Sequence, residues 1–241
     1  MKKLAISGVL GKMGQVLRQT VIEDATFEYI GGFDRSMDSY VVTNINDLKD
    51  ADVLIDFSTP KLLDTILEYG MKHQVALVLA TTGYNDLEFE KIKKASQSIP
   101  IFYSANYSVG VYLLTKALNM ISHSIDNSYD IEIIDKHHRY KKDAPSGTAI
   151  KLYDAINDGL NKKRELIFGH TNKTGIHVHS LRLGNYVGEH EVIFSNLNET
   201  ISLTHIAHDK SIFAKGALKA AHFLSNKTHG LYGMDDLFEA N

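Results

Sequence analysis

The sequence contains no cysteine, which excludes disulfide bridges, cysteine-ligated zinc, iron–sulfur clusters and thiol catalysis. It has no apolar run close to the ~20 residues of a membrane helix, and its 26 basic and 29 acidic residues form no long block of one sign. These absences give no reason to expect a membrane or nucleic-acid partner. Lys12 interrupts the apolar stretch that follows Met1, so this stretch is typical of a first strand rather than a signal peptide, and a cytoplasmic location is expected.

The first hundred residues have the pattern of a parallel sheet covered by helices. With 241 residues and 44% hydrophobic content, the chain is long enough for one large or two modest domains. Short apolar runs alternate with segments of helical period. The predicted strands are Lys3–Ser7, Glu28–Phe33, Val53–Phe57, Val75–Ala80 and Ile99–Tyr103. Ligands of such sheets bind beyond the carboxyl ends of the strands, so we expect the binding residues there.

The second half of the chain follows a different pattern. We expect a helix over Val109–Ile125, a strand over Tyr129–Asp135, a polar basic loop, a helix over Gly147–Leu160 and a charged connector over Asn161–Thr174. Three strands then follow without an intervening helix, at His177–Leu183, Glu189–Phe194 and Thr200–Ile206, which favours a mostly antiparallel or mixed sheet. A last helix, about Ser211–Ser225, fits either domain. The predicted fold class is α/β: a Rossmann-type parallel-sheet domain plus a second α+β domain.

A glycine-rich turn directly follows the first predicted strand. Gly8, Gly11 and Gly14 have the spacing G-x-x-G-x-x-G, a variant of the dinucleotide-binding fingerprint. Glycines at a strand-to-helix turn let backbone N–H groups approach a pyrophosphate. An ordinary tight turn has the same composition, so the turn alone is a weak signal.

The end of the second predicted strand strengthens the nucleotide hypothesis. Asp34 lies about 20 residues past the last glycine of the turn, where a carboxylate accepts hydrogen bonds from the adenosine ribose. Arg35 follows at once, and its planar fork suits a 2′-phosphate. We therefore expect binding of NADPH, NADH or both. The small and hydroxyl-bearing residues of Ala80–Gly83 and Ser104–Tyr107 end two further strands and are expected to lie along the nicotinamide half.

The most informative stretch is the basic loop before the predicted helix Gly147–Leu160. This loop carries His137, His138 and Lys141. Ser146 is placed as a helix N-cap, so the N–H groups of Gly147 and Thr148 offer an anion site strengthened by the helix dipole. A substrate with one or two carboxylates fits such a site. A hydride added to an unsaturated ring needs a matching proton, which His137 or Lys141 can supply.

The remaining histidines give little support for a metal centre. The chain has 12 histidines, and His177 and His179 share one face of a strand. No HExxH helix and no carboxylate at ligand spacing accompanies them, so no metal is expected.

These motifs together resemble the dihydrodipicolinate reductase family, also called 4-hydroxy-tetrahydrodipicolinate reductase, of the bacterial diaminopimelate and lysine pathway. The resemblance covers nearly the whole chain and is most specific in the stretch from His137 to Ala149, HHRYKKDAPSGTA. The other segments that carry it are Gly8–Gly14, Asp34-Arg35, Asp56–Ser58, Thr81–Gly83, Ala105–Gly110, Arg182–Gly184 and Val187–His190.

The resemblance implies a reaction and a set of roles. It implies hydride transfer from NADPH or NADH to a cyclic unsaturated imine dicarboxylate with loss of its hydroxyl, giving tetrahydrodipicolinate. It makes His137 the acid/base residue and Lys141 a proton donor, with His138, Gly147 and Thr148 binding the substrate carboxylates. The residues that it assigns to the nucleotide are Gly8, Val9, Leu10, Gly11, Lys12, Met13, Asp34, Arg35, Ala80, Thr81, Thr82, Ser104, Ala105, Asn106 and Tyr107.

The resemblance also implies an architecture and an assembly. Residues 1–107 and 212–241 form the nucleotide domain, residues 108–211 form the substrate and oligomerisation domain, and hinges near Tyr107 and Ser211 allow closure. A homotetramer through the second-domain sheet is implied. Two departures stand out: Asp135-Lys136 replaces the usual Glu-Ala, and Ala80 replaces a usual glycine.

Two alternatives stay open from the residues alone. One is another Rossmann dehydrogenase that acts on a small carboxylate or amino acid. The other is a nucleotide-sensing module without chemistry, against which the basic histidine loop argues.

Overall fold

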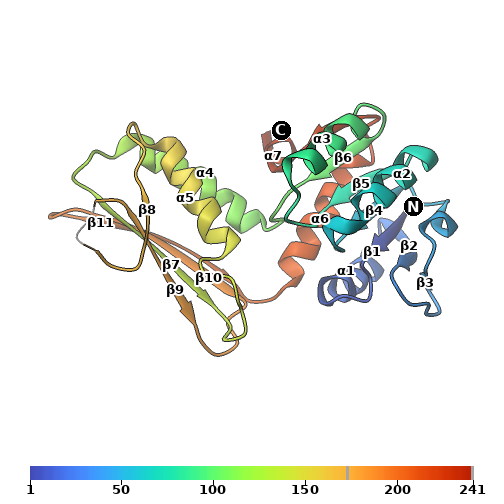
Figure 1. The fold of residues 1–241 in the computed structure, drawn as a ribbon, viewed down its shortest axis with the longest axis horizontal. Helices are drawn as coiled ribbons and strands as arrows, with labels where there is room; N and C mark the ends of the chain where they lie inside the picture. Colours follow the sequence, from blue (N-terminus) through green and yellow to red (C-terminus); the bar gives the residue numbers. More distant parts are fainter. Residues whose placement is uncertain (172–173, 240–241) are drawn as a thin grey trace. The chain divides into compact units, whose positions relative to one another are not determined.

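The computed structural model describes residues 1–171 and 174–239. Within them the chain divides into two compact units, one made of Met1–Tyr107 and the segment that starts at Ser211, the other of Ser108–Lys210 (Figure 1). The predicted connector includes residues 172–173 and the predicted first domain includes residues 240–241, which lie outside the described residues. No helix of the described residues is long and apolar enough to cross a membrane.

Unit 1 is built on a sheet of seven parallel strands. Their order is β12-β6-β5-β4-β1-β2-β3, so the first six strands have the order 3-2-1-4-5-6 of a Rossmann fold. The strands are β1 (Lys2–Ser7), β2 (Phe27–Phe33), β3 (Val41–Val42), β4 (Val53–Asp56), β5 (Ala76–Leu79), β6 (Pro100–Tyr103) and β12 (Gly230–Tyr232). The central strands are buried on both faces, which explains their continuous apolar runs.

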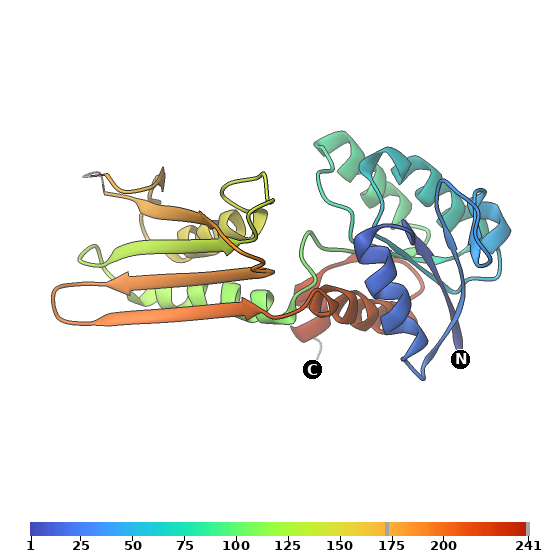
Figure 2. The ribbon, with the colours of Figure 1, turned by 90° about the horizontal axis from the view of Figure 1, so that it is seen from below.

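Helices cover both faces of this sheet (Figure 2). Helix α1 (Lys12–Ile22) packs beside α6 (Ser211–Leu224), and α2 (Leu63–His73) packs beside α3 (Asp86–Ala95). Two short 3-10 turns, Ile45–Leu48 and Pro60–Leu62, and helix α7 (Met234–Glu239) complete the unit. The last long helix fits either domain by its residue pattern, and the family resemblance places it in the nucleotide domain. In the structure it belongs to unit 1. Its alanines pack closely, and a Cβ on Gly216 would lie 1.8 Å from the carbonyl oxygen of Tyr107.

Unit 2 is a mixed sheet with two helices on one face. The strand order is β11-β10-β7-β9-β8, with β7 parallel to β9 and antiparallel to β10. The strands are β7 (Asp130–His137), β8 (Leu166–Phe168), β9 (Ile176–Arg182), β10 (Gly188–Ser195) and β11 (Thr200–Ala207). Helices α4 (Val109–Ser124) and α5 (Gly147–Gly159) lie side by side on the sheet (Figures 1 and 2). Alternate residues of β7 and β10 face this pair, and their apolar side chains form the core of the unit.

The two sheets confirm the predicted fold class, with three corrections. The charged connector contains the short strand β8, which pairs with β9. The chain after α6 adds β12 and α7, which the sequence did not predict. The strand predicted to stop at Asp135 continues to His137, because Lys136 and His137 still pair with neighbouring strands.

Candidate active site

The glycine turn of unit 1 depends on glycine at two positions. Gly8 has a φ of 76°, and a Cβ there would lie 2.6 Å from the carbonyl oxygen of Phe57. A Cβ on Gly14 would lie 2.1 Å from the carbonyl oxygen of Gly8, so α1 packs directly on the turn. Only glycine permits this conformation and this close approach. The result is a tight backbone turn at the start of a helix, with Gly11 exposed, which fits a dinucleotide phosphate.

Asp34 connects the end of β2 to the glycine turn. One carboxylate oxygen accepts a hydrogen bond from the N–H of Leu10 at 2.9 Å, and the other accepts one from the N–H of Arg35 at 2.7 Å. The Arg35 side chain is exposed. The acidic and basic residues predicted to meet the adenosine end therefore lie at the same edge of the sheet as the glycines.

The predicted residues after β5 and β6 also lie at this edge, but the hydroxyls of Thr81, Ser104 and Tyr107 already donate hydrogen bonds within the protein. The Thr81 hydroxyl donates to Oδ2 of Asp56 at 2.7 Å, and the buried Tyr107 hydroxyl donates to the carbonyl oxygen of Leu79 at 2.9 Å. These residues can line a nucleotide through their backbone rather than through their hydroxyls. Ala80 is buried, whereas Thr82 and Ala105 are exposed.

Asp56 is a buried carboxyl that the sequence did not single out. It ends β4 with no exposed surface and accepts hydrogen bonds from Thr81 and from the N–H of Ser58. Burial raises the pKa of Asp56, and these hydrogen bonds offset only part of the increase. The sequence feature that could have pointed to Asp56 is the Asp-Phe-Ser at the end of an apolar strand, because α/β sheets bind ligands at such strand ends.

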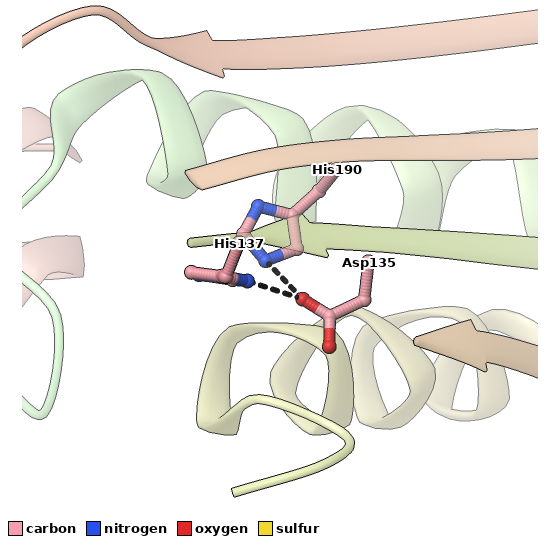
Figure 3. A group of neighbouring side chains, drawn as sticks. All are labelled: Asp135, His137 and His190. Atoms are coloured by element: carbon pink, nitrogen blue, oxygen red, sulfur yellow. Dashed lines mark ion pairs between the residues drawn. The ribbon is translucent and has the colours of Figure 1, made fainter. Parts of the chain in front are cut away.

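Asp135 lies at the centre of the histidine cluster of unit 2. Its Oδ1 lies 2.8 Å from Nδ1 of His137 and 3.4 Å from Nε2 of His190, as Figure 3 shows. Its Oδ2 accepts hydrogen bonds from the N–H of Ser146 at 2.9 Å and from Arg182 at 3.1 Å. Burial alone would raise the pKa of Asp135, but its contacts with His137, His190, Ser146 and Arg182 outweigh burial and hold this pKa well below its usual range.

This cluster brings together residues from three strands. Asp135 and His137 lie on the same face of β7 because side chains alternate along a strand, and Arg182 and His190 come from the neighbouring strands β9 and β10. The sequence analysis assigned a role to His137 alone. The alternation of Asp135 and His137 was a usable signal, but the participation of His190 depends on strand register.

The N-terminus of α5 lies against the same cluster. Ser146 is its N-cap, and its hydroxyl accepts a hydrogen bond from the N–H of Ala149 at 3.1 Å. The same hydroxyl lies 3.1 Å from Nε2 of His190. A Cβ on Gly147 would meet no atom within 4 Å, so the first turn opens onto free space. The positive end of the helix dipole and an open first turn together suit an anion.

The other two predicted side chains lie on the loop that precedes α5. Lys141 forms an ion pair with Asp143 at 2.8 Å, and His138 stacks loosely with Tyr140 at a ring distance of 6.4 Å. Among the contacts of the described residues, Lys141 does not touch His137. The structure therefore brings His137 and Gly147 to one cluster and leaves Lys141 on the loop.

Metal binding at the cluster needs separate consideration. Asp135, His137 and His190 each offer a ligand atom, and these atoms lie within 4.8 Å of one another. The Arg182 guanidinium, however, already places a positive charge on the carboxylate. A cation would have to share Asp135 with Arg182, so the expectation of no metal stays our prediction.

Comparison with known proteins identifies the family. The model described as "Dihydrodipicolinate reductase, N-terminus" matches residues 2–107, and "Dihydrodipicolinate reductase, C-terminus" matches residues 110–238. A 4-hydroxy-tetrahydrodipicolinate reductase of Caldanaerobacter subterraneus subsp. tengcongensis is 41% identical over 247 residues, with 98% of each chain covered. The chain belongs to the dihydrodipicolinate reductase family. This finding confirms the resemblance and decides against the two alternatives.

Two further comparisons agree. A 4-hydroxy-tetrahydrodipicolinate reductase of Clostridium novyi is 40% identical, covering 100% of this chain and 99% of that one. A solved dihydrodipicolinate reductase from Paenisporosarcina sp. TG-14 with dipicolinate bound shares the fold, with a TM-score of 0.83, 23% identity and 99% of both chains covered.

Proposed function

We propose that unit 1 binds NADPH or NADH along the glycine turn, and that unit 2 binds the substrate carboxylates at the N-terminus of α5, beside His137 as proton donor. The observation that carries this proposal is the cluster of unit 2. There Ser146 connects the open first turn of α5 to the carboxylate that holds His137. Its N–H donates to Asp135, and its hydroxyl caps the helix.

Family membership gives the reaction. The chain is an NAD(P)H-dependent 4-hydroxy-tetrahydrodipicolinate reductase of diaminopimelate and lysine biosynthesis, and its substrate is a cyclic dicarboxylate. When bound, the nicotinamide supplies the hydride. A biosynthetic enzyme that draws on this coenzyme is expected in the cytoplasm.

The nucleotide role of unit 1 is supported by the shape of its turn. We assign the phosphates to the backbone of Gly8–Met13, because this tight turn leads into the N-terminus of α1 with Gly11 exposed. Asp34 and Arg35 are assigned to the adenosine ribose and its 2′ substituent. The segments Ala80–Thr82 and Ser104–Tyr107 are assigned to the nicotinamide half, since they end the neighbouring strands β5 and β6.

The substrate role of unit 2 is supported by charge. A carboxylate at Gly147 and Thr148 would be stabilised by the helix dipole, and His138 and Lys141 add cationic or donor groups on the preceding loop. Asp135 engages Nδ1 of His137, so Nε2 is the nitrogen that can give a proton to substrate. A Cβ on Gly188 would lie 3.1 Å from this Nε2, so the glycine keeps that nitrogen uncrowded.

Replacing His137 tests the proposed acid. We expect His137→Gln to lower turnover by about 10²–10⁴-fold and to leave NADPH affinity unchanged, because the acid is lost while the glycine turn is untouched. NADPH absorbance is followed with freshly generated substrate, and nucleotide affinity is followed by fluorescence. His179→Gln is the matched control, since His179 pairs with Glu132 on β7 away from the cluster. Turnover that survives His137→Gln would remove His137 from the mechanism.

Lys141 is tested against its neighbour. Lys141→Ala should lower turnover well beyond Lys142→Ala, which removes an exposed lysine to which we assign no role. Equal effects of the two variants would show that only the charge of the loop matters.

We also propose the homotetramer that the family resemblance implies. The face of the unit 2 sheet opposite α4 and α5 carries Ile134, Ile193 and Ile206, of which Ile206 is 49% exposed. Charged side chains such as Glu189 and Glu191 lie among these isoleucines. A sheet face with exposed apolar side chains set among charged ones is a suitable association surface. Light scattering should give about four times the 26.9 kDa chain mass, whereas a monomer mass would refute the assembly.

A further inference from the structure

The buried cluster around Asp135 contains more titratable groups than one proton donor requires. His137 and His190 both lie against Oδ1 of Asp135, with their rings 5.2 Å apart in an edge-to-face arrangement (Figure 3). All three side chains are at least nine-tenths buried. The proposed mechanism uses Asp135 to hold His137, but it gives His190 no task.

The charges around the cluster limit how many protons it can hold. Asp135 on β7 supplies one negative charge, and Arg182 on β9 supplies one fixed positive charge at 3.1 Å. One imidazolium gives the cluster a net charge of about +1, and a second would add a further buried positive charge without a partner. Charge balance therefore favours one imidazolium in the cluster over two.

One further carboxylate, Asp143, interacts with Arg182, but it is already ion-paired with Lys141 at 2.8 Å. From α5, Ser146 presents a hydroxyl to His190 and a backbone N–H to Asp135. From β11, His205 lies directly opposite His190 in the strand register, and its Nε2 lies 3.3 Å from the Ser108 hydroxyl. Burial and the nearby His190 lower the pKa of His205, which disfavours a positive charge on this residue.

We propose that Asp135 is the positioning residue for His137: it fixes Nδ1, leaves Nε2 to face substrate, and balances one positive charge that His137 and His190 share. This inference rests on the proposed role of His137. In the reaction the Nε2–H bond of His137 breaks as the proton passes to substrate, and the imidazolium becomes a neutral imidazole. A proton from solvent then restores the charge of the cluster.

The proposal predicts the direction of a change in the pH profile. The acid must be protonated, so kcat/KM falls on the basic limb of the pH profile as the acid loses its proton. Asp135→Asn removes the negative charge that favours the imidazolium, so this basic limb should move to lower pH by about one unit or more, with kcat reduced at least about tenfold. Asp135→Glu restores the charge and should bring the limb back to within about half a unit.

Two other variants separate positioning from simple structure. Arg182→Gln removes the fixed positive charge, so the basic limb should move in the opposite direction, to higher pH. His190→Gln keeps an amide donor for Asp135 but cannot take up a positive charge. The basic limb of this variant should move to lower pH, by less than in Asp135→Asn. Glu132→Gln is the matched control: it removes a carboxylate–histidine pair from the opposite face of β7 and should leave the limb in place.

The experiment is the pH dependence of kcat/KM for these variants, with NADPH affinity and thermal unfolding measured in parallel. A limb that stays in place in Asp135→Asn, or that moves as far in Asp135→Glu, overturns the proposal. If Asp135→Asn does not fold, Arg182→Gln decides, and an unmoved or lowered limb overturns it. If His137→Gln loses turnover but the basic limb is unchanged in Asp135→Asn, only this inference is rejected. If turnover survives in His137→Gln, the proposed function is rejected.

Discussion

The two serine caps of unit 2 form a natural matched pair for mutation. Ser146 caps α5 by accepting from the N–H of Ala149 at 3.1 Å, and Ser108 caps α4 by accepting from the N–H of Val111 at 3.2 Å. Both serines are buried, and each hydroxyl also lies beside a histidine. Only α5 is proposed to hold substrate. Replacing each serine by alanine therefore separates the loss of a cap from the loss of the binding site.

The expected magnitudes differ because the two histidines differ in burial. Loss of an N-cap serine costs about 1 kcal/mol, within a range of roughly 0.5–2 kcal/mol. In Ser146→Ala the buried His190 also loses a hydrogen-bond partner, which adds about 1 kcal/mol or more. His205, beside Ser108, is partly exposed, so water can replace its partner. We expect Ser108→Ala to cost about 1 kcal/mol and Ser146→Ala about 2 kcal/mol.

The assay combines thermal unfolding with substrate kinetics. Both variants should unfold at lower temperature than wild type, with the larger decrease in Ser146→Ala. Only Ser146→Ala should raise KM for the dicarboxylate, by about tenfold, because the first turn of α5 loses its cap and its hydroxyl contact with His190. Tenfold corresponds to about 1.4 kcal/mol. Equal decreases in unfolding temperature with unchanged KM in both variants would refute the reasoning.

Three further predictions concern unit 1. Arg35→Ala should weaken NADPH more than NADH in fluorescence titrations, and equal losses would show that Arg35 does not meet the 2′-phosphate. Gly14→Ala should separate α1 from the turn, destabilise the chain by about 1–3 kcal/mol and weaken both nucleotides at least about tenfold, so unchanged affinity would contradict the assigned packing. Because burial raises the folded-state pKa of Asp56 above its ordinary value of 3.8, its contribution to stability is present below that pH and is lost as pH rises through the raised value. Asp56→Asn should remove this decrease from the unfolding temperature measured against pH, and an unchanged pH dependence would exclude Asp56 as its source.

The nucleotide unit was predictable because its signals are local. The strand, the glycine turn and the acidic residue at the end of β2 each follow from a few neighbouring residues, and the parallel sheet follows from their repetition. Strands β8 and β12 were not predictable in this way. Each has three residues and exists through pairing with β9 or β6, so tertiary contacts rather than local pattern define it.

The cluster of unit 2 shows where sequence reasoning stops. His137 was identified as an acid, but it was placed on a loop, because the polar sequence after Asp135 resembles one. Pairing of His137 with Arg182 keeps it in β7 and points it to the same face as Asp135. The partnership with His190 arises only from the register of β10, which no local pattern encodes.

The most direct test of the account is a crystal structure with NADPH and dipicolinate bound. We expect one carboxylate within hydrogen-bond distance of the N–H groups of Gly147 and Thr148, with the ring facing Nε2 of His137. A dipicolinate seated elsewhere, with the first turn of α5 in contact with solvent alone, would contradict it.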